Sequence, residues 1–185
     1  MTIYYKICIH IVLIFFMAYA PCMAGNSLSD EEKKTIVYEM YGKYKKQDFP
    51  DVKEIHPKQA MELLKAGKVI FVDIRKQSEM DVSMLPDAIP EAVFLEHPEK
   101  YKNKMVVAYC TISYRSALFT QRMQKQNIPV QNLIGGLLAW VLEGGKIYDQ
   151  KGETRRIHVY GKEWNYPADG YESVMFGFFE RLLDP

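Results

Sequence analysis

The order of elements is clearest around one stretch, which reads Val106-Val107-Ala108-Tyr109-Cys110-Thr111-Ile112-Ser113-Tyr114-Arg115-Ser116. Its apolar first half has the character of a strand, and this strand ends at Cys110. A short polar loop follows, closes on Arg115, and leads into a segment from Ser116 to Gln126 with helical spacing of its apolar residues. We therefore predict that Cys110 lies where a strand ends and a helix begins. Backbone N–H groups and the positive end of the helix would then face the sulfur and stabilise its reactive thiolate form.

The flanking segments alternate between strand and helix. The strongest strand is Val69 to Arg75, a continuous apolar run typical of a strand buried on both faces. Further strands are predicted at residues 52–55, 92–95 and 130–134, and helices after His56-Pro57, at residues 116–126 and after Gly135-Gly136. The alternation predicts an α/β domain with a mainly parallel central sheet flanked by helices. His56 is expected to cap its helix or to lie on the surface, and the helix at 116–126 is expected to bury Ala117, Leu118 and Met123.

The prediction divides the chain into four parts. Residues 1–24 form a signal peptide, and residues 25–50 form a linker and a helix. That helix begins at a capping box made by Ser29 and Glu32 and carries an aromatic stripe that should pack on the domain. Residues 51–150 form the α/β domain, and residues 151–185 form a C-terminal extension packed against it.

The N-terminal segment has the pattern of a secretory signal peptide. Lys6 supplies a weak positive charge, Ile7 to Ala20 is almost entirely apolar, and Cys22-Met23-Ala24 offers a cleavage site. The apolar run falls short of the ~20 residues that span a bilayer. We therefore expect an exported protein, periplasmic or secreted; an N-terminal membrane anchor is the alternative, and only a retained segment would contact a membrane.

Export would leave one cysteine in the mature chain. The sequence contains three cysteines, and Cys8 and Cys22 fall in the predicted signal peptide. Cys110 alone cannot form an internal disulfide, so it is either an inert buried thiol or a reactive one. The loop around it favours the reactive thiol.

The composition fits a soluble globular protein. Of 185 residues, 48% are hydrophobic and 25% charged, which leaves room for one domain plus extensions. The formal net charge is +1 and no long basic stripe is present, so no nucleic-acid partner is expected.

Two polar residues follow the strongest strand. Asp73 and Arg75 stand at the end of the sheet where open α/β proteins place their sites. They either line the site or form a pair that holds the strand end to a neighbouring loop, and the sequence leaves both interpretations open.

The loop after Cys110 has the features of an anion site. Successive backbone N–H groups of Thr111, Ile112, Ser113 and Tyr114 could curve into an anion-binding nest, and Arg115 adds a fixed positive charge. A thiolate at the start of such a loop is a nucleophile. A persulfide, with its outer sulfur in the nest, is one group that would suit it.

From about Val52 to Tyr148 the chain resembles a single-domain rhodanese. The resemblance is carried, in order, by Asp73-Ile74-Arg75, by the loop Cys110 to Ser116, and by Gly135-Gly136-Leu137-Leu138-Ala139-Trp140. It implies a sulfurtransferase in which Cys110 accepts a sulfane sulfur from a small-molecule donor and passes it to a thiophilic acceptor, which could be a partner protein. It also implies that the six-residue loop cradles the persulfide, that Arg115 stabilises anionic sulfur, and that no cofactor is needed.

The loop departs from its relatives at one position. Ser113 stands where many relatives have glycine, and a positive φ there would cost serine about 1 kcal/mol or more. Arg115 is also the only cation in the loop, whereas relatives that prefer thiosulfate often have more.

One alternative is a cysteine-dependent phosphatase or arsenate reductase. Such enzymes place five residues between the cysteine and the arginine, whereas four separate Cys110 from Arg115. The tighter loop leaves less room for a tetrahedral oxyanion, and the sequence nominates no aspartate as general acid.

The other alternative is a non-catalytic sulfur carrier or binding module of the same fold, since a carrier needs the same persulfide. A metal site is not expected, because His97 and His158 lack metal-ligand spacing with each other or with Cys110.

Overall fold

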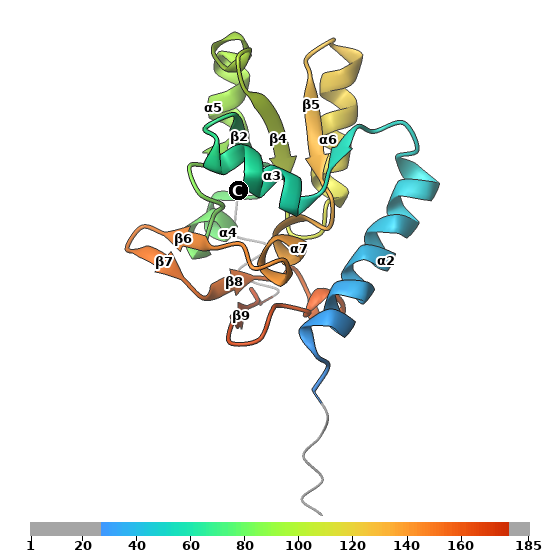
Figure 1. The fold of residues 1–185 in the computed structure, drawn as a ribbon, viewed down its shortest axis with the longest axis vertical. Coiled ribbons are helices and arrows are strands. Elements are labelled where there is room, and N and C mark those ends of the chain that lie inside the picture. Colours follow the sequence, from blue (N-terminus) through green and yellow to red (C-terminus); the bar gives the residue numbers. More distant parts are fainter. Residues whose placement is uncertain (1–26, 178–185) are drawn as a thin grey trace, which may run out of the picture.

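A five-stranded parallel sheet forms the centre of the part of the protein that the computed structural model describes, residues 27–177 (Figure 1). The predicted signal peptide lies outside the described residues. The sheet order is β1-β5-β4-β2-β3, and each neighbouring pair is parallel, which confirms the predicted α/β fold. The strands are β1 (Glu54–Ile55), β2 (Val69–Asp73), β3 (Ile89–Pro90), β4 (Met105–Tyr109) and β5 (Val130–Leu133). Because β4 is the middle strand, the residue after it, Cys110, lies at the centre of the sheet's carboxyl edge.

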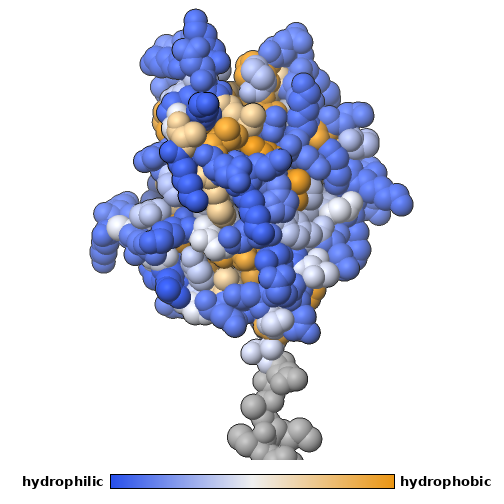
Figure 2. Space-filling model, in the orientation of Figure 1, coloured by the Kyte–Doolittle hydropathy of each residue, from blue (hydrophilic) through white to orange (hydrophobic). Residues whose placement is uncertain are grey.

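Helices cover both faces of the sheet (Figure 1). One face packs against α2 (Asp30–Asp48), α3 (Pro57–Lys65) and α7 (Gly136–Leu142), and the other against α5 (Glu91–Glu96) and α6 (Tyr114–Lys125). The chain also forms the short helix α4 (Gln77–Val82) and the 3-10 turns η1 (Pro98–Tyr101) and η2 (Lys162–Trp164). Hydrophilic side chains cover most of the face shown in Figure 2, with smaller apolar patches between them.

Two helix starts form as predicted. Ser29 Oγ accepts a hydrogen bond from the Glu32 amide, and Glu32 Oε2 accepts one from the Ser29 amide at 2.8 Å, so the capping box is complete. His56 caps α3 through Nδ1, which accepts from the Lys58 amide at 3.3 Å. None of the helices within residues 27–177 has the length and apolar character needed to cross a bilayer.

Two local predictions are wrong. The strand predicted at residues 92–95 belongs to helix α5, which begins directly after Pro90; only Phe94 of this segment is buried. A four-residue apolar run fits either element, and here the proline and Glu91 begin a helix. Leu118 is 48% exposed rather than in the core, because Phe119 and Met123, four residues apart, define the buried face of α6.

A buried ion pair joins the end of β2 to the loop after α4. The Asp73 and Arg75 side chains are fully buried, and Arg75 Nε and Nη2 donate to the two carboxylate oxygens at 2.9 and 2.7 Å. Arg75 Nη2 also donates to the Ser83 carbonyl at 2.6 Å, and the Tyr109 hydroxyl donates to Asp73. Of the two interpretations left open above, the structure therefore supports the one in which the pair holds the strand end to a neighbouring loop.

The segment after the domain returns to pack against it. The hairpin of β6 (Ile147–Asp149) and β7 (Gly152–Thr154) is followed by β8 (Arg156–His158) and β9 (Glu172–Val174), which pair in parallel. Ile157 and Val159 are fully buried in the main hydrophobic core. Lys33 on α2 forms an ion pair with Asp169, so the N-terminal helix and the C-terminal extension contact each other.

The buried pair generates a stability prediction. Arg75→Met should lower the free energy of unfolding by about 3–5 kcal/mol, because it leaves Asp73 buried without its cation. Arg122→Met is the matched control: Arg122 is half-exposed in its pair with Glu91, and its loss should cost under ~1 kcal/mol. Urea unfolding of both variants measures the difference, and equal losses would contradict the role given to Arg75.

Candidate active site

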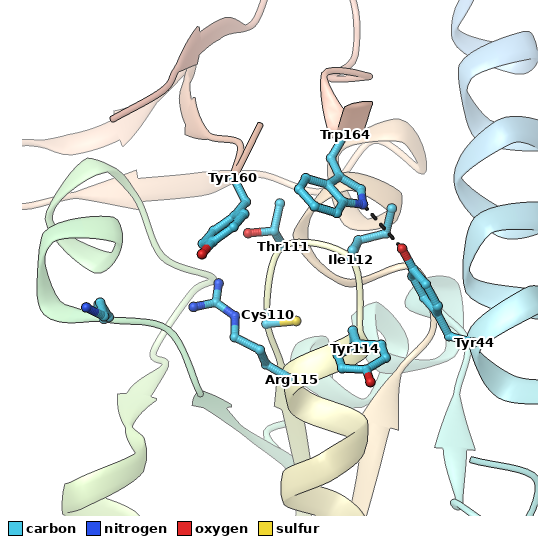
Figure 3. Close-up of a pocket in the computed structure, with 9 residues that line it drawn as sticks. Tyr44, Cys110, Thr111, Ile112, Tyr114, Arg115, Tyr160 and Trp164 are labelled. Carbon is cyan, nitrogen blue, oxygen red and sulfur yellow. Dashed lines mark hydrogen bonds between the residues drawn. The ribbon is translucent and has the colours of Figure 1, made fainter. Parts of the chain in front are cut away.

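Cys110 lies at the base of a pocket of about 510 Å³ (Figure 3). The residue is 2% exposed, and its Sγ accepts a hydrogen bond from Ser116 Oγ at 3.6 Å. In Figure 3 the sulfur points into the curve of the loop that follows it. The pocket is lined by Tyr44, Lys76, Cys110, Thr111, Ile112, Tyr114, Arg115, Tyr160 and Trp164.

Carbonyl groups of the loop accept hydrogen bonds from α7 and β5. The Cys110 and Thr111 carbonyls accept hydrogen bonds from the Leu137 and Leu138 amides at 2.8 and 3.1 Å, and the Ser113 carbonyl accepts from Asn132 Nδ2 at 3.3 Å. The backbone N–H groups of residues 111–116 form no hydrogen bond within the described part of the chain. A loop with fixed carbonyls and available N–H groups is what an anion-binding nest requires.

Gly136 makes the contact between the loop and α7 possible. Its φ is +58°, and a Cβ on this residue would lie 2.3 Å from the Cys110 carbonyl oxygen. A side chain at this position would therefore push α7 away from the loop. Only glycine allows the two hydrogen bonds from the Leu137 and Leu138 amides to form. Gly136, the second residue of the glycine pair that precedes the predicted helix, permits this close approach.

Ser113 adopts the left-handed conformation that the sequence comparison with glycine suggested. Its φ is 76°, and its side chain is fully buried. The hydroxyl donates to the Leu133 carbonyl, so the residue anchors the loop to β5. The strain of about 1 kcal/mol that serine carries at positive φ is offset by a hydrogen bond of similar size.

A buried carboxylate holds the guanidinium of Arg115. Nη1 and Nη2 donate to the two oxygens of Glu79 at 2.7 and 2.8 Å, and His158 Nδ1 lies 3.0 Å from the same carboxylate. Burial opposes ionisation of Glu79, but the two hydrogen bonds from Arg115 outweigh it and hold the pKa of Glu79 well below its usual range. Burial opposes the charge of Arg115, but the hydrogen bonds to Glu79 and the negative charges of Cys110 and Glu79 outweigh it. The pKa of Arg115 is therefore raised above its usual value. Arg115 is thus a permanent, oriented cation.

Four aromatic side chains line the pocket around the loop, and we call them the aromatic collar: Tyr44, Tyr114, Tyr160 and Trp164 (Figure 3). Trp164 Nε1 donates to the Tyr44 hydroxyl at 3.4 Å. The rings of Tyr44 and Tyr114 pack edge to face at 5.2 Å, and those of Tyr160 and Trp164 at 5.6 Å. Arg115 Cζ lies 5.6 Å from the centre of the Tyr160 ring, which joins the collar to the loop.

The structure brings most of the sequence-predicted site residues together. Cys110, Thr111, Ile112, Tyr114 and Arg115 line the pocket, whereas Ser113 is buried beneath the loop. Asp73 and Arg75 do not line the pocket; they fix the end of the neighbouring strand, β2, to the loop after α4.

Several residues of the site were not predicted from the sequence. Glu79 was not singled out, and His158 was considered only as a metal ligand. Tyr44 belongs to the aromatic stripe that was expected to pack on the domain, and Ser116 and Trp164 were given no role in the site. Nothing in their spacing signals a common site, because they come from five separate elements: α2, α4, α6, β8 and η2. Within residues 27–177, no three His, Cys, Asp or Glu side chains cluster as a metal site would require.

Comparison with known proteins identifies the family. The model of the rhodanese-like domain matches residues 56–143. A sulfurtransferase from Allochromatium vinosum is 34% identical over 88 residues, which cover 45% of this chain and 82% of the relative. The chain therefore belongs to the rhodanese-like family, as the resemblance indicated.

Two further matches cover a larger share of this chain. A tRNA uridine(34) hydroxylase from Shouchella clausii is 30% identical over 137 residues, 68% of this chain but only 41% of the hydroxylase. The structure of a thiosulfate sulfurtransferase from Pseudomonas aeruginosa, 20% identical, superposes with a TM-score of 0.50 over 74% of this chain and 26% of that one. The structural match confirms the rhodanese fold.

The conformation of Ser113 can be tested with two substitutions. Ser113→Ala keeps the strain and loses the hydrogen bond, so it should lower the free energy of unfolding by about 1 kcal/mol. Ser113→Gly loses the same bond but relieves the strain, so it should be more stable than Ser113→Ala by about 1 kcal/mol. Urea unfolding distinguishes them; a glycine variant less stable than the alanine variant would contradict the positive φ.

Proposed function

We propose that the protein is a sulfurtransferase that moves a sulfane sulfur from a donor to a thiophilic acceptor through a persulfide on Cys110. The observation that carries this proposal is the position of Cys110 in a loop whose six following N–H groups, those of residues 111–116, have no partner in the described chain. Membership of the rhodanese-like family and a relative named sulfurtransferase support the same chemistry.

In the first step the Cys110 thiolate attacks the sulfane sulfur of the donor. A bond forms between Sγ and that sulfur, the donor's own bond to it breaks, and the leaving group departs with the electron pair. The product is a persulfide anion with its charge on the outer sulfur. The N–H groups of the loop are placed to stabilise this charge, as oxyanion-hole donors do in other enzymes.

In the second step the acceptor, a thiolate or another soft nucleophile, attacks the outer sulfur. The S–S bond breaks and its electrons return to Cys110 Sγ, which restores the thiolate. Arg115 faces the pocket and favours both anionic states of the cysteine. The Ser116 hydroxyl, 3.6 Å from Sγ, stabilises the thiolate that leaves.

Mass spectrometry tests the nucleophile. After incubation with a sulfane-sulfur donor and digestion, the peptide that contains Cys110 should gain one sulfur, and Cys110→Ser should abolish this gain without unfolding the protein. Peptide mapping is needed because the full sequence also contains Cys8 and Cys22. Loading of sulfur in the serine variant, or hydrolysis of a phosphoester with no loading in the wild type, would contradict the proposal.

Steady-state kinetics tests Arg115. Arg115→Lys retains the charge but loses the bidentate bond to Glu79, so kcat/KM for sulfur transfer should fall by about 10- to 100-fold. Arg122→Lys, on the exposed face of the same helix, is the control and should change kcat/KM by less than ~2-fold. A wild-type protein that loads sulfur but turns over slowly with every small acceptor would instead be a sulfur carrier.

A further inference from the structure

The C-terminal extension places a histidine against the ion pair of the loop after Cys110. His158 is the last residue of β8 and lies beyond residue 143, where the match to the family model ends. Its side chain is almost fully buried, and its Nδ1 lies 3.0 Å from Oε1 of Glu79, the carboxylate that binds Arg115. His158 does not line the pocket around Cys110, so its route to the loop runs through Glu79.

The imidazole ring of His158 is fixed in its position. It stacks on the ring of Phe176, with 4.5 Å between the ring centres and 32° between the ring planes. The adjacent residues Ile157 and Val159 are fully buried in the main hydrophobic core, and β8 pairs in parallel with β9. A side chain that is already ordered in this way loses little further conformational entropy by contacting Glu79.

The carboxylate of Glu79 is contacted on both of its oxygens. Oε2 accepts hydrogen bonds from Arg115 Nη1 at 2.7 Å and from the Lys76 backbone N–H at 3.1 Å. Oε1 accepts from Arg115 Nη2 at 2.8 Å, and it is this oxygen that faces His158. An ionised carboxylate can only accept, so the contact with His158 is attractive when Nδ1 carries a proton, as in one neutral tautomer or in the imidazolium ion.

The orientation of Glu79 determines that of Arg115. A bidentate pair keeps the carboxylate and the guanidinium in one plane, so a rotation of the first would turn the second. Arg115 Cζ also lies 5.6 Å from the ring centre of Tyr160, a residue of the aromatic collar two positions after His158. The same short segment of the extension therefore contacts Arg115 directly and supports it through Glu79. Loss of the imidazole would remove one of the contacts that hold this buried carboxylate.

We propose, on the basis of the sulfurtransferase function above, that His158 is a positioning residue, which holds Glu79 in the orientation that keeps the Arg115 guanidinium directed at the loop and its bound sulfur anion. The C-terminal extension thereby contributes to the reaction without supplying a reacting atom. His158 forms no bond to sulfur and transfers no proton in either step.

Two substitutions of His158 test the proposal through kcat/KM for sulfur transfer. His158→Leu removes the polar contact, whereas His158→Asn places an amide N–H close to the position of Nδ1. The value should fall at least ~5-fold in the leucine variant and stay within ~2-fold of the wild type in the asparagine variant. His158→Met replaces the leucine variant if that one does not fold.

Ile157→Val is the matched control. It removes a buried methyl group from the same strand but leaves His158 in place, so kcat/KM should change by less than ~2-fold. A leucine or methionine variant with the wild-type value, or an asparagine variant as slow as either of them, would overturn the proposal.

A double-mutant cycle distinguishes positioning from a general disturbance of the fold. If His158 acts through Arg115, His158→Leu should slow the Arg115→Met variant by less than ~2-fold, because the group that it positions is already absent. A loss as large as the one in the wild-type background would show that His158 acts in another way, and the proposal would fail.

Alkylation of Cys110 by iodoacetamide at pH 7 provides a readout that needs no sulfur donor. Arg115 favours the thiolate, which is the form that reacts, so the rate should fall at least ~3-fold in His158→Leu and be retained in His158→Asn. Peptide mapping separates Cys110 from Cys8 and Cys22. Equal rates in the wild type and the leucine variant would overturn the role of His158. If the wild-type protein loads no sulfur, the sulfurtransferase function fails, and these rates still decide whether His158 positions Arg115.

Discussion

Two hydrogen bonds, from the amides of Leu137 and Leu138 to the carbonyls of Cys110 and Thr111, determine how the loop presents itself to a ligand. They turn the carbonyl oxygens toward α7 and leave the N–H groups on the other side available. The bonds depend on Gly136, because any Cβ there would collide with the Cys110 carbonyl. They also depend on the position of α7, whose seven residues are all buried. The chemistry of the cysteine therefore depends on the packing of a short helix that contributes no side chain to the pocket.

Two ionic clusters with buried carboxylates hold the elements next to the Cys110 loop in place. Asp73 and Arg75 fix the end of β2 to the loop after α4, next to the end of β4 that leads into Cys110. Glu79 extends from α4 to Arg115 and meets His158 from β8. Glu79 thus links the C-terminal extension to the loop after Cys110, and it fixes the direction of Arg115, the one cation in that loop. Each cluster contains a buried carboxylate, Asp73 or Glu79, and the loss of its arginine would leave that charge buried without a partner.

The parts of this protein that could be predicted depend on residues that are close together in the sequence. The apolar runs of β2 and β4, the capping box at Ser29 and the order Cys110 to Arg115 lie in continuous sequence, so periodicity and spacing located the sheet and the loop. The positive φ of Ser113 could be anticipated because the family places glycine there.

The rest could not be predicted because it depends on packing between distant segments. Trp164 reaches Tyr44 across 120 residues, and the Arg115–Glu79 pair spans 36. Neither separation leaves a periodic signal. Helix α5 was mistaken for a strand because four apolar residues satisfy both patterns, and the choice is made by the proline before them and by the packing of Phe94 against Phe119.

The most direct test of the central claim is a crystal structure of the protein after reaction with a sulfane-sulfur donor. The outer sulfur of the Cys110 persulfide should lie inside the loop, within hydrogen-bonding distance of backbone N–H groups of residues 111–116, with the Leu137 and Leu138 bonds intact. A persulfide that points out of the loop, or a loop whose carbonyls have turned toward the sulfur, would contradict the account.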